Sequence, residues 1–343
     1  MDKVEFFKNG SRWLRADFHL HTKSDTEFLR FNGTDSEFTS QYIAQLKRQG
    51  IGVGVVTNHN KFNNEEFCAL KKAADIENIY LLPGVEFSLR DGSRGTHLLI
   101  VFDYDWICNP ERKNYIEVFL NGAFVGIPQY DSSPYPNSKY TLQEAVAALD
   151  EFNHDYFLVM AHVDSKNGMF EEIEARNLNT FATSEAFTSR VFALQKSRNR
   201  DNRAKIPNVA LVEGTDNAGG GIAAIGCGNE EKCVTQKTYV KLGDFNLAAL
   251  KYALRDYGNR VRTDDYVASY NSYIESIENE NHALIVYDPK ANEFSMVLGR
   301  SAQTYLNGTQ LADCAALNDG DTIKLGKSVF HFIAYCKEDR RWV

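Results

Sequence analysis

Short apolar runs alternate with amphipathic stretches along most of the chain, from residue 16 onwards. Runs that predict strands cover residues 16–22, 51–60, 79–89, 95–102, 155–163 and 208–216. Stretches that predict helices cover residues 35–50, 65–78, 141–152 and 187–202. Gly50 is expected to end the first helix, and Thr141 with Glu144 forms a predicted capping box. Strands that alternate with helices predict an α/β fold, with a parallel sheet, open or closed, covered by helices.

Two parts of the chain depart from this rhythm. Residues 108–139 are rich in Pro, Asn, Ser and Tyr, which predicts an insertion at the mouth of the sheet. A strand and a helix in residues 238–262 are expected to complete a first domain, residues 1–262. From 263 to 343, short apolar alternations separated by turns predict a small antiparallel β domain, with hairpins at Asn307-Gly308 and Asp319-Gly320.

Composition narrows the classes of function. A chain of 343 residues with 43% hydrophobic residues can form two unequal domains. A net charge of −8 excludes a global basic field, so any nucleic-acid contact must be local. The six cysteines show no CxxC spacing, which favours reduced thiols. Neither a secretory signal nor a bilayer-spanning run is recognised, so a soluble cytoplasmic protein without membrane contacts is expected. No P-loop motif occurs.

Histidines and carboxylates gather where the predicted strands begin or end. His19 and His21 alternate in one strand, so both side chains face the same side and can converge on one metal ion. Further polar residues at strand tips are His59, Glu86, His97, His162 and Asp216. In α/β sheets and barrels, such tips meet at the face where active sites form. Histidine and carboxylate ligands without thiolates suit zinc, manganese or iron, so a metal site is predicted.

The segments "DFHLHTKSD", "VVTNHN", "GVEFS", "THLLIVF", "MAHVD" and "GTDNA" resemble the ordered motifs of the polymerase and histidinol phosphatase (PHP) superfamily. They extend over about residues 13–220. The flanking segments resemble the PHP module of TrlF-type proteins, in which an ATPase follows. No such ATPase is recognised here, which leaves room for a separate ATPase partner. The resemblance implies a distorted (β/α)7 barrel whose carboxyl face holds two or three divalent metal ions.

Matching the motifs residue by residue implies three ligand sets. His19, His21, Glu86 and Asp216 would hold one ion, and Glu86 would bridge to a second ion held by His97 and His162. The third site would use Asp25, His59 and a histidine that is replaced here by Ala218. The motif that is usually TDH also reads "TNH", with Asn58, and "HTKSD" is one residue shorter than the common spacing. The first two sites are therefore expected to be intact, and the third to lack a ligand.

Such a centre implies hydrolysis of phosphoesters, with Glu86, His19, His21 and Asp216 as the central catalytic set. The candidates for contacts with substrate phosphate are Lys23, Arg90, Arg94 and Arg190. A basic run at the end of a predicted helix includes Lys196, Arg198, Arg200, Arg203 and Lys205. This run, with the TrlF-type resemblance, favours a nuclease acting on DNA or RNA. The alternatives are a phosphatase for small phosphomonoesters and a catalytically impaired metal-binding interaction module.

The C-terminal segments "NHALIVYD", "TYLNG" and "LNDGDTIKLGKSVFHF" resemble the second half of a forkhead-associated (FHA) β-sandwich, over about residues 279–335. In that family a serine, an arginine and an asparagine hold phosphothreonine. The matching positions here are Asn279, Glu280 and Ala302, and a glutamate repels the phosphate that the arginine attracts. His282 is expected to be structural. The domain is therefore predicted not to bind phosphothreonine, and to serve as a packing, homodimerising or partner-docking module.

Overall fold

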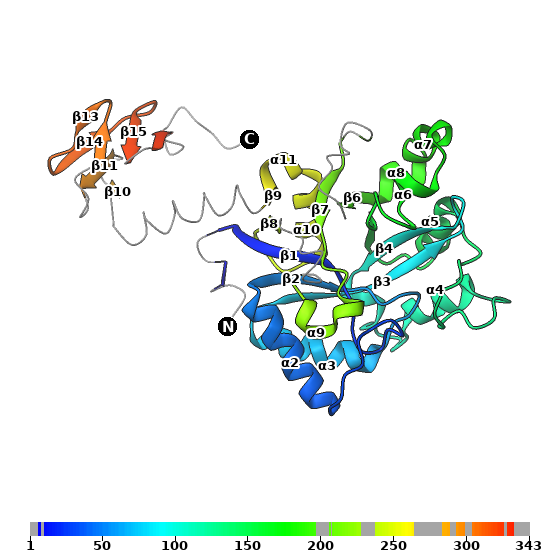
Figure 1. The fold of residues 1–343 in the computed structure, drawn as a ribbon. Coiled ribbons are helices and arrows are strands. Elements are labelled where there is room, and N and C mark those ends of the chain that lie inside the picture. The colour runs from blue at the N-terminus through cyan, green and yellow to red at the C-terminus, as the bar shows by residue number, and fades with distance from the viewer. Residues whose placement is uncertain are drawn as a thin grey trace. The chain divides into compact units, whose positions relative to one another are not determined.

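The computed structural model describes residues 6–7, 10–196, 206, 208–227, 237–263, 283–288, 293–298, 304–325 and 328–332. The chain divides into two compact units, Met1–Asp264 and Asp265–Val343. The expected fold class is confirmed: an α/β unit with a barrel-like sheet precedes a unit of small antiparallel sheets (Figure 1). Among the described helices, none has the length and apolar character needed to cross a bilayer.

The first unit is built on one nine-stranded sheet, in the order β7-β6-β5-β4-β3-β2-β1-β8-β9. Its strands are β1 (Arg12–Leu20), β2 (Ile51–Val56), β3 (Tyr80–Leu89), β4 (Thr96–Phe102), β5 (Tyr156–Met160), β6 (Val191–Lys196), β7 (Ala210–Glu213), β8 (Thr238–Leu242) and β9 (Val261–Thr263). The edge strand β7 also contacts β1 and β9. Glu213 N donates a hydrogen bond to Thr238 Oγ1 at 2.7 Å, linking β7 to β8. The sheet therefore curls into a nearly closed barrel.

Helices and short helical turns connect most of these strands. They are α2 (Asp35–Arg48), α3 (Asn64–Ile76), η1 (Tyr104–Trp106), α4 (Tyr115–Ala123), α5 (Leu142–Asp150), α6 (Met169–Glu172), α7 (Ala175–Ala182), α8 (Glu185–Arg190), η2 (Ala218–Gly220), α9 (Gly221–Ala224), α10 (Leu247–Arg255) and α11 (Tyr257–Arg260). The predicted capping box of Thr141 and Glu144 is confirmed at the start of α5. A second box, Thr34 with Glu37, begins α2. Both boxes satisfy backbone N–H groups that the first helical turn leaves unpaired.

The predicted parallel sheet is parallel only in part. Strands β1, β2 and β3 are parallel, as are β5, β6 and β7. However, β4 runs antiparallel to both β3 and β5, and β8 runs antiparallel to β1 and β9. Only residues 90–95 join β3 to β4, which is too short for the crossover that parallel neighbours require.

The helix predicted over residues 187–202 is confirmed for residues 187–190 and wrong for residues 191–196, and residues 197–202 lie outside the described residues. Helix α8 ends at Arg190, and strand β6 begins at Val191. A short apolar run such as "VFALQK" fits a helix or a buried strand equally well. Residues 191–196 form a strand because they pair with β5 on one side and with β7 on the other.

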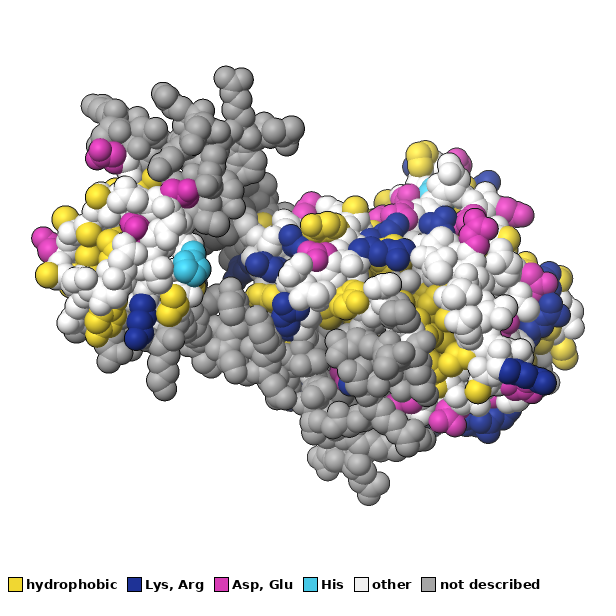
Figure 2. Space-filling view, turned by 90° about the horizontal axis from the view of Figure 1, so that it is seen from above, with side chains coloured by type: hydrophobic (Ala, Val, Ile, Leu, Met, Phe, Trp, Pro, Cys, Tyr) yellow, Lys and Arg dark blue, Asp and Glu magenta, His cyan; other side chains and the backbone are white. Residues whose placement is uncertain are grey.

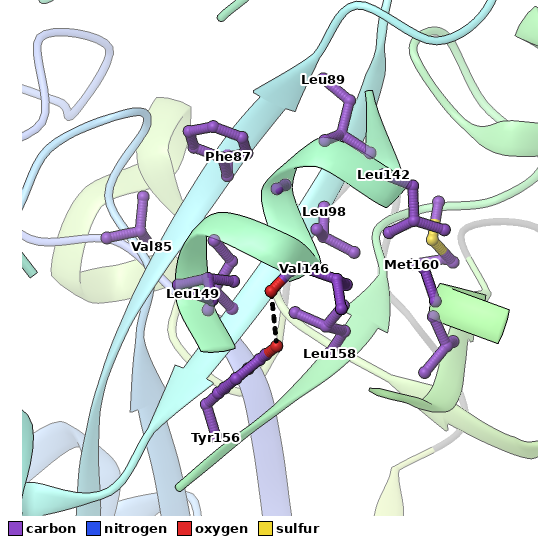
Figure 3. Close-up of a cluster of buried hydrophobic side chains, with 14 of the residues drawn as sticks. Val85, Phe87, Leu89, Leu98, Leu142, Val146, Leu149, Tyr156, Leu158 and Met160 are labelled. Carbon is purple, nitrogen blue, oxygen red and sulfur yellow. Dashed lines mark hydrogen bonds between the residues drawn. The ribbon is translucent and has the colours of Figure 1, made fainter. Parts of the chain in front are cut away.

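A large apolar core lies between the sheet and helices α4, α5 and α8. Figure 3 shows part of it, where side chains from β3 and β4 pack against those of α5. Tyr156 in β5 donates a hydrogen bond to the Val146 carbonyl at 3.4 Å. The segment 108–139 contributes to this core, because α4 buries Ile116 and Phe119. Residues 125–138 of that segment continue outside any helix or strand towards the carboxyl end of β3.

The described residues of the second unit form two small antiparallel sheets. One has the order β10 (Ala283–Asp288), β11 (Glu293–Leu298), β14 (Cys314–Leu317), and the other β13 (Thr309–Gln310), β12 (Thr304–Leu306), β15 (Thr322–Leu325), β16 (Ser328–His331). Met296, Leu311, Leu317 and Ile323 form its core.

One of the two hairpin predictions for this unit is confirmed. Asn307 and Gly308 both have positive φ and join the paired strands β12 and β13. The hairpin at Asp319-Gly320 was wrong, because that turn connects β14 in one sheet to β15 in the other. The positions matched to phosphothreonine binding, Asn279, Glu280 and Ala302, lie outside the described residues, as does His282.

Candidate metal centre

The carboxylate of Glu86 lies at the centre of a cluster of imidazoles. Its Oε2 atom is 2.8 Å from His19 Nε2 and 2.9 Å from His59 Nε2. Its Oε1 atom is 2.7 Å from His97 Nδ1 and 3.0 Å from His162 Nε2. The glutamate is only 1% exposed. One buried carboxylate therefore presents each of its oxygens to a different pair of histidines.

The strand directions explain how residues far apart in the sequence meet here. His19 lies near the carboxyl end of β1, and His162 follows β5. His59 follows β2 and forms an isolated parallel bridge with Glu86 of β3. Because β4 is antiparallel to β3, His97 at the beginning of β4 is opposite Ser88 at the end of β3. The antiparallel strand thus brings its first residues, rather than its last, to the metal-binding face.

His21 and Asp216 complete one side of the cluster. His21 Nε2 lies 3.3 Å from Asp216 Oδ1 and 3.5 Å from Glu86 Oε2. Asp216 follows β7, and its N–H donates to the His19 carbonyl at 2.9 Å. Asp216 and His162 both have positive φ, which is uncommon for residues other than glycine and is concentrated at functional sites.

Asp25 lies behind two of these histidines. Its Oδ2 atom is 2.8 Å from His21 Nδ1 and 2.9 Å from His59 Nδ1. All eight metal ligands expected from the sequence therefore lie in one cluster around Glu86 or directly behind it. Ala218, at the position that the motif resemblance matched to a third-site histidine, is buried in η2.

Several polar residues that sequence reasoning missed hold the histidines in place. Gln195 Oε1 accepts from His19 Nδ1 at 2.8 Å and from the His162 N–H at 3.3 Å. Asn217 Oδ1 accepts from the His21 N–H at 2.7 Å. Gly214 allows its own backbone to lie close to His19, since a Cβ at position 214 would be 2.7 Å from His19 Cβ. The sequence signal that could have identified Gln195 is its polar amide side chain within the apolar run "VFALQK".

The cluster strongly perturbs its own protonation. Burial acts to lower the pKa of His19, but the Glu86 and Asp216 carboxylates outweigh it and raise this pKa to about 9. Burial likewise acts to lower the pKa of His59, which Glu86 and Asp25 raise to about 11. Burial acts to raise the pKa of Glu86, but the surrounding histidines hold it well below its ordinary value. The protonated imidazoles of His19 and His59 and the ionised carboxylates therefore stabilise each other's charges. A bound metal cation can replace the positive charge of these protons.

The donor set fits divalent metal ions. Three overlapping groups bring ligand atoms within 4.8 Å of one another: His19, His21 and Asp216; His21, Asp25 and His59; and His59, Glu86 and His97. The buried Nε2 atom of His21 makes no hydrogen bond to any described residue, although two carboxylate oxygens lie close by. Nitrogen and oxygen donors without thiolates suit zinc, manganese or iron.

The cations expected to contact phosphate are each paired with a carboxylate of the chain. Lys23 pairs with Asp35, Arg90 with Glu144 at 3.0 Å, Arg94 with Glu172 at 2.8 Å and Arg190 with Asp150 at 2.7 Å. Arg190 directly precedes β6, so it lies at the amino end of that strand, away from the carboxyl ends that carry the metal-binding cluster. The structure thus does not bring Arg190 to the site.

Lys196, the first residue of the basic run, lies 3.9 Å from Glu213. It ends β6 rather than lying on a helix. Arg198, Arg200, Arg203 and Lys205 are outside the described residues. On the face shown in Figure 2, Lys and Arg side chains are interspersed with Asp and Glu side chains, so the described residues form no one-sided basic field there.

Comparison with known proteins identifies the C-terminal segment. Residues 276–326 match the FHA domain family, which confirms that part of the predicted resemblance. Among curated proteins, no sequence match was found.

Several solved structures are similar to the chain. A two-domain protein of Bacteroides vulgatus that contains a predicted PHP-like metal-dependent phosphoesterase is 14% identical, with a TM-score of 0.48, over 84% of this chain and 77% of that one. A Bifidobacterium adolescentis protein assigned as a metal-dependent phosphoesterase is 13% identical, with a TM-score of 0.40, over 60% and 89%. An amidohydrolase of Chromobacterium violaceum is 14% identical, with a TM-score of 0.33, over 53% and 76%.

Proposed function

We propose that this chain is a metal-dependent phosphoesterase that hydrolyses phosphodiester bonds in nucleic acid. The observation that carries the proposal is the placement of Glu86, whose two oxygens face separate sets of imidazoles. A carboxylate in this position can bridge two ions. When bound, two such ions supply the activation of a water molecule and the stabilisation of the attacking and leaving oxygens of a phosphate ester.

The residues of the chain would divide between two ion positions. His19, His21 and His59 face Glu86 Oε2, and Asp216 lies beside His21. His97 and His162 face Glu86 Oε1. An imidazole that carries a second proton must release it to become a ligand, because only an unprotonated ring nitrogen has a lone pair to offer. Gln195 fixes the orientation of His19 by accepting from its Nδ1 atom. The protein thus supplies a preoriented set of donors.

Nucleic acid is the favoured substrate because of where β6 ends. Strand β6 is parallel to β5, so Lys196 lies at the same end of the sheet as His162. The sequence continues from there with Arg198, Arg200, Arg203 and Lys205. Basic residues that come soon after Lys196 in the sequence suit contacts with a phosphate backbone.

A panel of phosphoesters tests the proposal. The full chain would be assayed with Mn²⁺, Zn²⁺ or Mg²⁺ against an aryl phosphate, a bis-aryl phosphodiester, single- and double-stranded DNA, and RNA. We expect turnover of the diester and of nucleic acid, with loss of at least about a hundredfold in Glu86→Gln because the bridging charge is gone. Glu172→Gln, which alters an equally buried glutamate outside the cluster, is the matched control.

The other outcomes identify the alternatives. Turnover of the monoester alone would replace this proposal by a phosphatase for small phosphomonoesters. Metal binding without turnover of any substrate would identify a catalytically impaired metal-binding module.

A further inference from the structure

The carboxylate of Asp25 is fully engaged by hydrogen-bond donors of the chain. Its Oδ2 atom accepts from His21 Nδ1 at 2.8 Å, from His59 Nδ1 at 2.9 Å and from the His59 N–H at 2.8 Å. Its Oδ1 atom accepts from the Tyr135 hydroxyl at 2.8 Å and from the Glu27 N–H at 2.9 Å. An ionised carboxylate offers about four lone-pair positions. Asp25 thus cannot also bind a metal ion without releasing some of these donors.

These bonds determine which nitrogen of each histidine is available. An acceptor-only carboxylate that faces Nδ1 requires a proton on Nδ1, so the lone pair of the neutral ring lies on Nε2. The Nε2 atoms of His21 and His59 point away from Asp25, to within 3.5 and 2.9 Å of Glu86 Oε2. The two rings stack, with centroids 4.8 Å apart. Asp25 therefore accepts a hydrogen bond from the Nδ1 atom of each histidine, as carboxylates that orient metal-ligating imidazoles commonly do.

Tyr135 holds this arrangement from the segment between α4 and α5. Its ring stacks on His59, with centroids 4.5 Å apart and planes 11° apart, while its hydroxyl bonds Asp25. The neighbouring residues are fixed to the sheet: Ser138 N donates to the Ser88 carbonyl at 2.8 Å, and the Pro136 carbonyl accepts from Asn60 at 3.3 Å. Tyr135 thus contacts both the histidine and the carboxylate that backs it.

We propose that Asp25 is a positioning residue, held by Tyr135, that directs the Nε2 atoms of His21 and His59 at a two-ion centre on Glu86, and that it is not a ligand of a third ion. The inference rests on the metal-dependent function proposed above. Ala218 supports it, since the place of a third-site histidine is taken by a buried methyl group. His59 then belongs to the set of ligands around Glu86 Oε2.

Titration of metal-stripped protein with Mn²⁺ alone tests this assignment, with calorimetry giving both stoichiometry and affinity. We expect two ions in the wild type. Asp25→Asn should still bind two ions, with an association constant about 10- to 100-fold lower, which is the usual effect of removing an orienting partner. Tyr135→Phe keeps the stacked ring and loses only the hydroxyl, so it should weaken binding in the same direction. Tyr130→Phe, in the same segment but stacked on Phe124, is the matched control.

Two results would overturn the assignment. One is three ions in the wild type and two in Asp25→Asn, with the affinity of the remaining two unchanged. The other is a Tyr135→Phe titration that superimposes on the wild type, and this comparison remains valid even if Asp25→Asn fails to fold. Failure of the proposed function looks different: the chain would bind two Mn²⁺ ions with the expected variant effects and still hydrolyse no phosphoester.

Discussion

Gln195 contacts two histidines of the candidate metal centre through one side-chain oxygen. That oxygen accepts from His19 Nδ1 and from the backbone N–H of His162, residues whose imidazoles face opposite oxygens of Glu86. The glutamine is 1% exposed, so no water can easily replace it. It therefore couples the orientations of both sides of the centre.

Replacing Gln195 by leucine should lower the Mn²⁺ association constant about 10- to 100-fold, because His19 loses the acceptor that fixes its ring. Calorimetric titration of metal-stripped protein measures this effect. Gln45→Leu is the control, since Gln45 is a buried glutamine of α2 that bonds the Ile225 carbonyl instead of a histidine. Equal affinities in wild type and Gln195→Leu would show that His19 needs no such support.

Protons and metal ions should compete for the histidines of this centre. Without metal, His19 and His59 keep their protons up to pKa values of about 9 and 11, because nearby carboxylates outweigh the effect of burial. Binding an ion must expel these protons, so affinity rises as pH rises and falls as pH falls. Between pH 6 and 8 we expect the Mn²⁺ association constant to increase by about 10- to 100-fold per pH unit, for one or two protons released.

Titrations across this pH range, in buffers of different ionisation enthalpy, give both the affinity and the number of protons released. His154→Gln should reproduce the wild-type slope, because His154 pairs with Asp105 and lies outside the cluster. An affinity independent of pH would mean that the histidines already lack protons before the ion binds.

At the scale of elements, α2 connects a surface cap to the metal-binding face. The helix begins with Thr34, whose hydroxyl accepts from Glu37 N at 3.2 Å. Its buried face presents Tyr42, whose hydroxyl donates to the His21 carbonyl at 3.1 Å. The helix is therefore stabilised at its exposed end and supports the site from its buried side.

Thr34→Ala should lower the free energy of unfolding of the first unit by about 1 kcal/mol, since it removes the cap and exposes no new apolar surface. Urea unfolding followed by tryptophan fluorescence measures this loss. Thr39→Ala, at a half-buried position inside the same helix, removes a hydroxyl that bonds the Asp35 carbonyl and should change stability by less than about 0.5 kcal/mol. The Mn²⁺ affinity should stay unchanged in both variants. A loss in Thr34→Ala no larger than in Thr39→Ala would show that the cap contributes nothing.

At the scale of the whole molecule, the C-terminal unit has an expected function of its own. The FHA family match covers residues 276–326. Yet the positions that would hold phosphothreonine are Asn279, Glu280 and Ala302. A glutamate beside a phosphate costs free energy by charge repulsion instead of contributing a charge-assisted hydrogen bond.

The full chain should therefore show no measurable binding to a phosphothreonine peptide library, beyond that seen with the same peptides unphosphorylated. Fluorescence polarisation with labelled peptides measures this. Binding of the phosphorylated peptides that free phosphothreonine competes away would contradict the prediction.

The sequence alone determined the residues of the cluster and the type of each domain. Histidines and carboxylates at the tips of apolar runs identified seven of the eight candidate ligands, because hydrophobic patterning locates strand ends and strand ends meet at one face. The eighth, Asp25, came from the resemblance to the PHP motifs. Turn chemistry likewise located the hairpin at Asn307-Gly308, since positive φ at both positions favours those residues.

Tertiary structure decided the rest. The direction of β4 follows from a connection too short for a crossover, and the strand character of residues 191–196 follows from pairing on both sides. Local sequence is ambiguous in both cases. The roles of Gln195 and Tyr135 depend on contacts with residues more than 30 positions away, which no local pattern encodes. Asp25 is the clearest case: the motif resemblance implies that it is a ligand, and only the donors packed around it show that its oxygens are already taken.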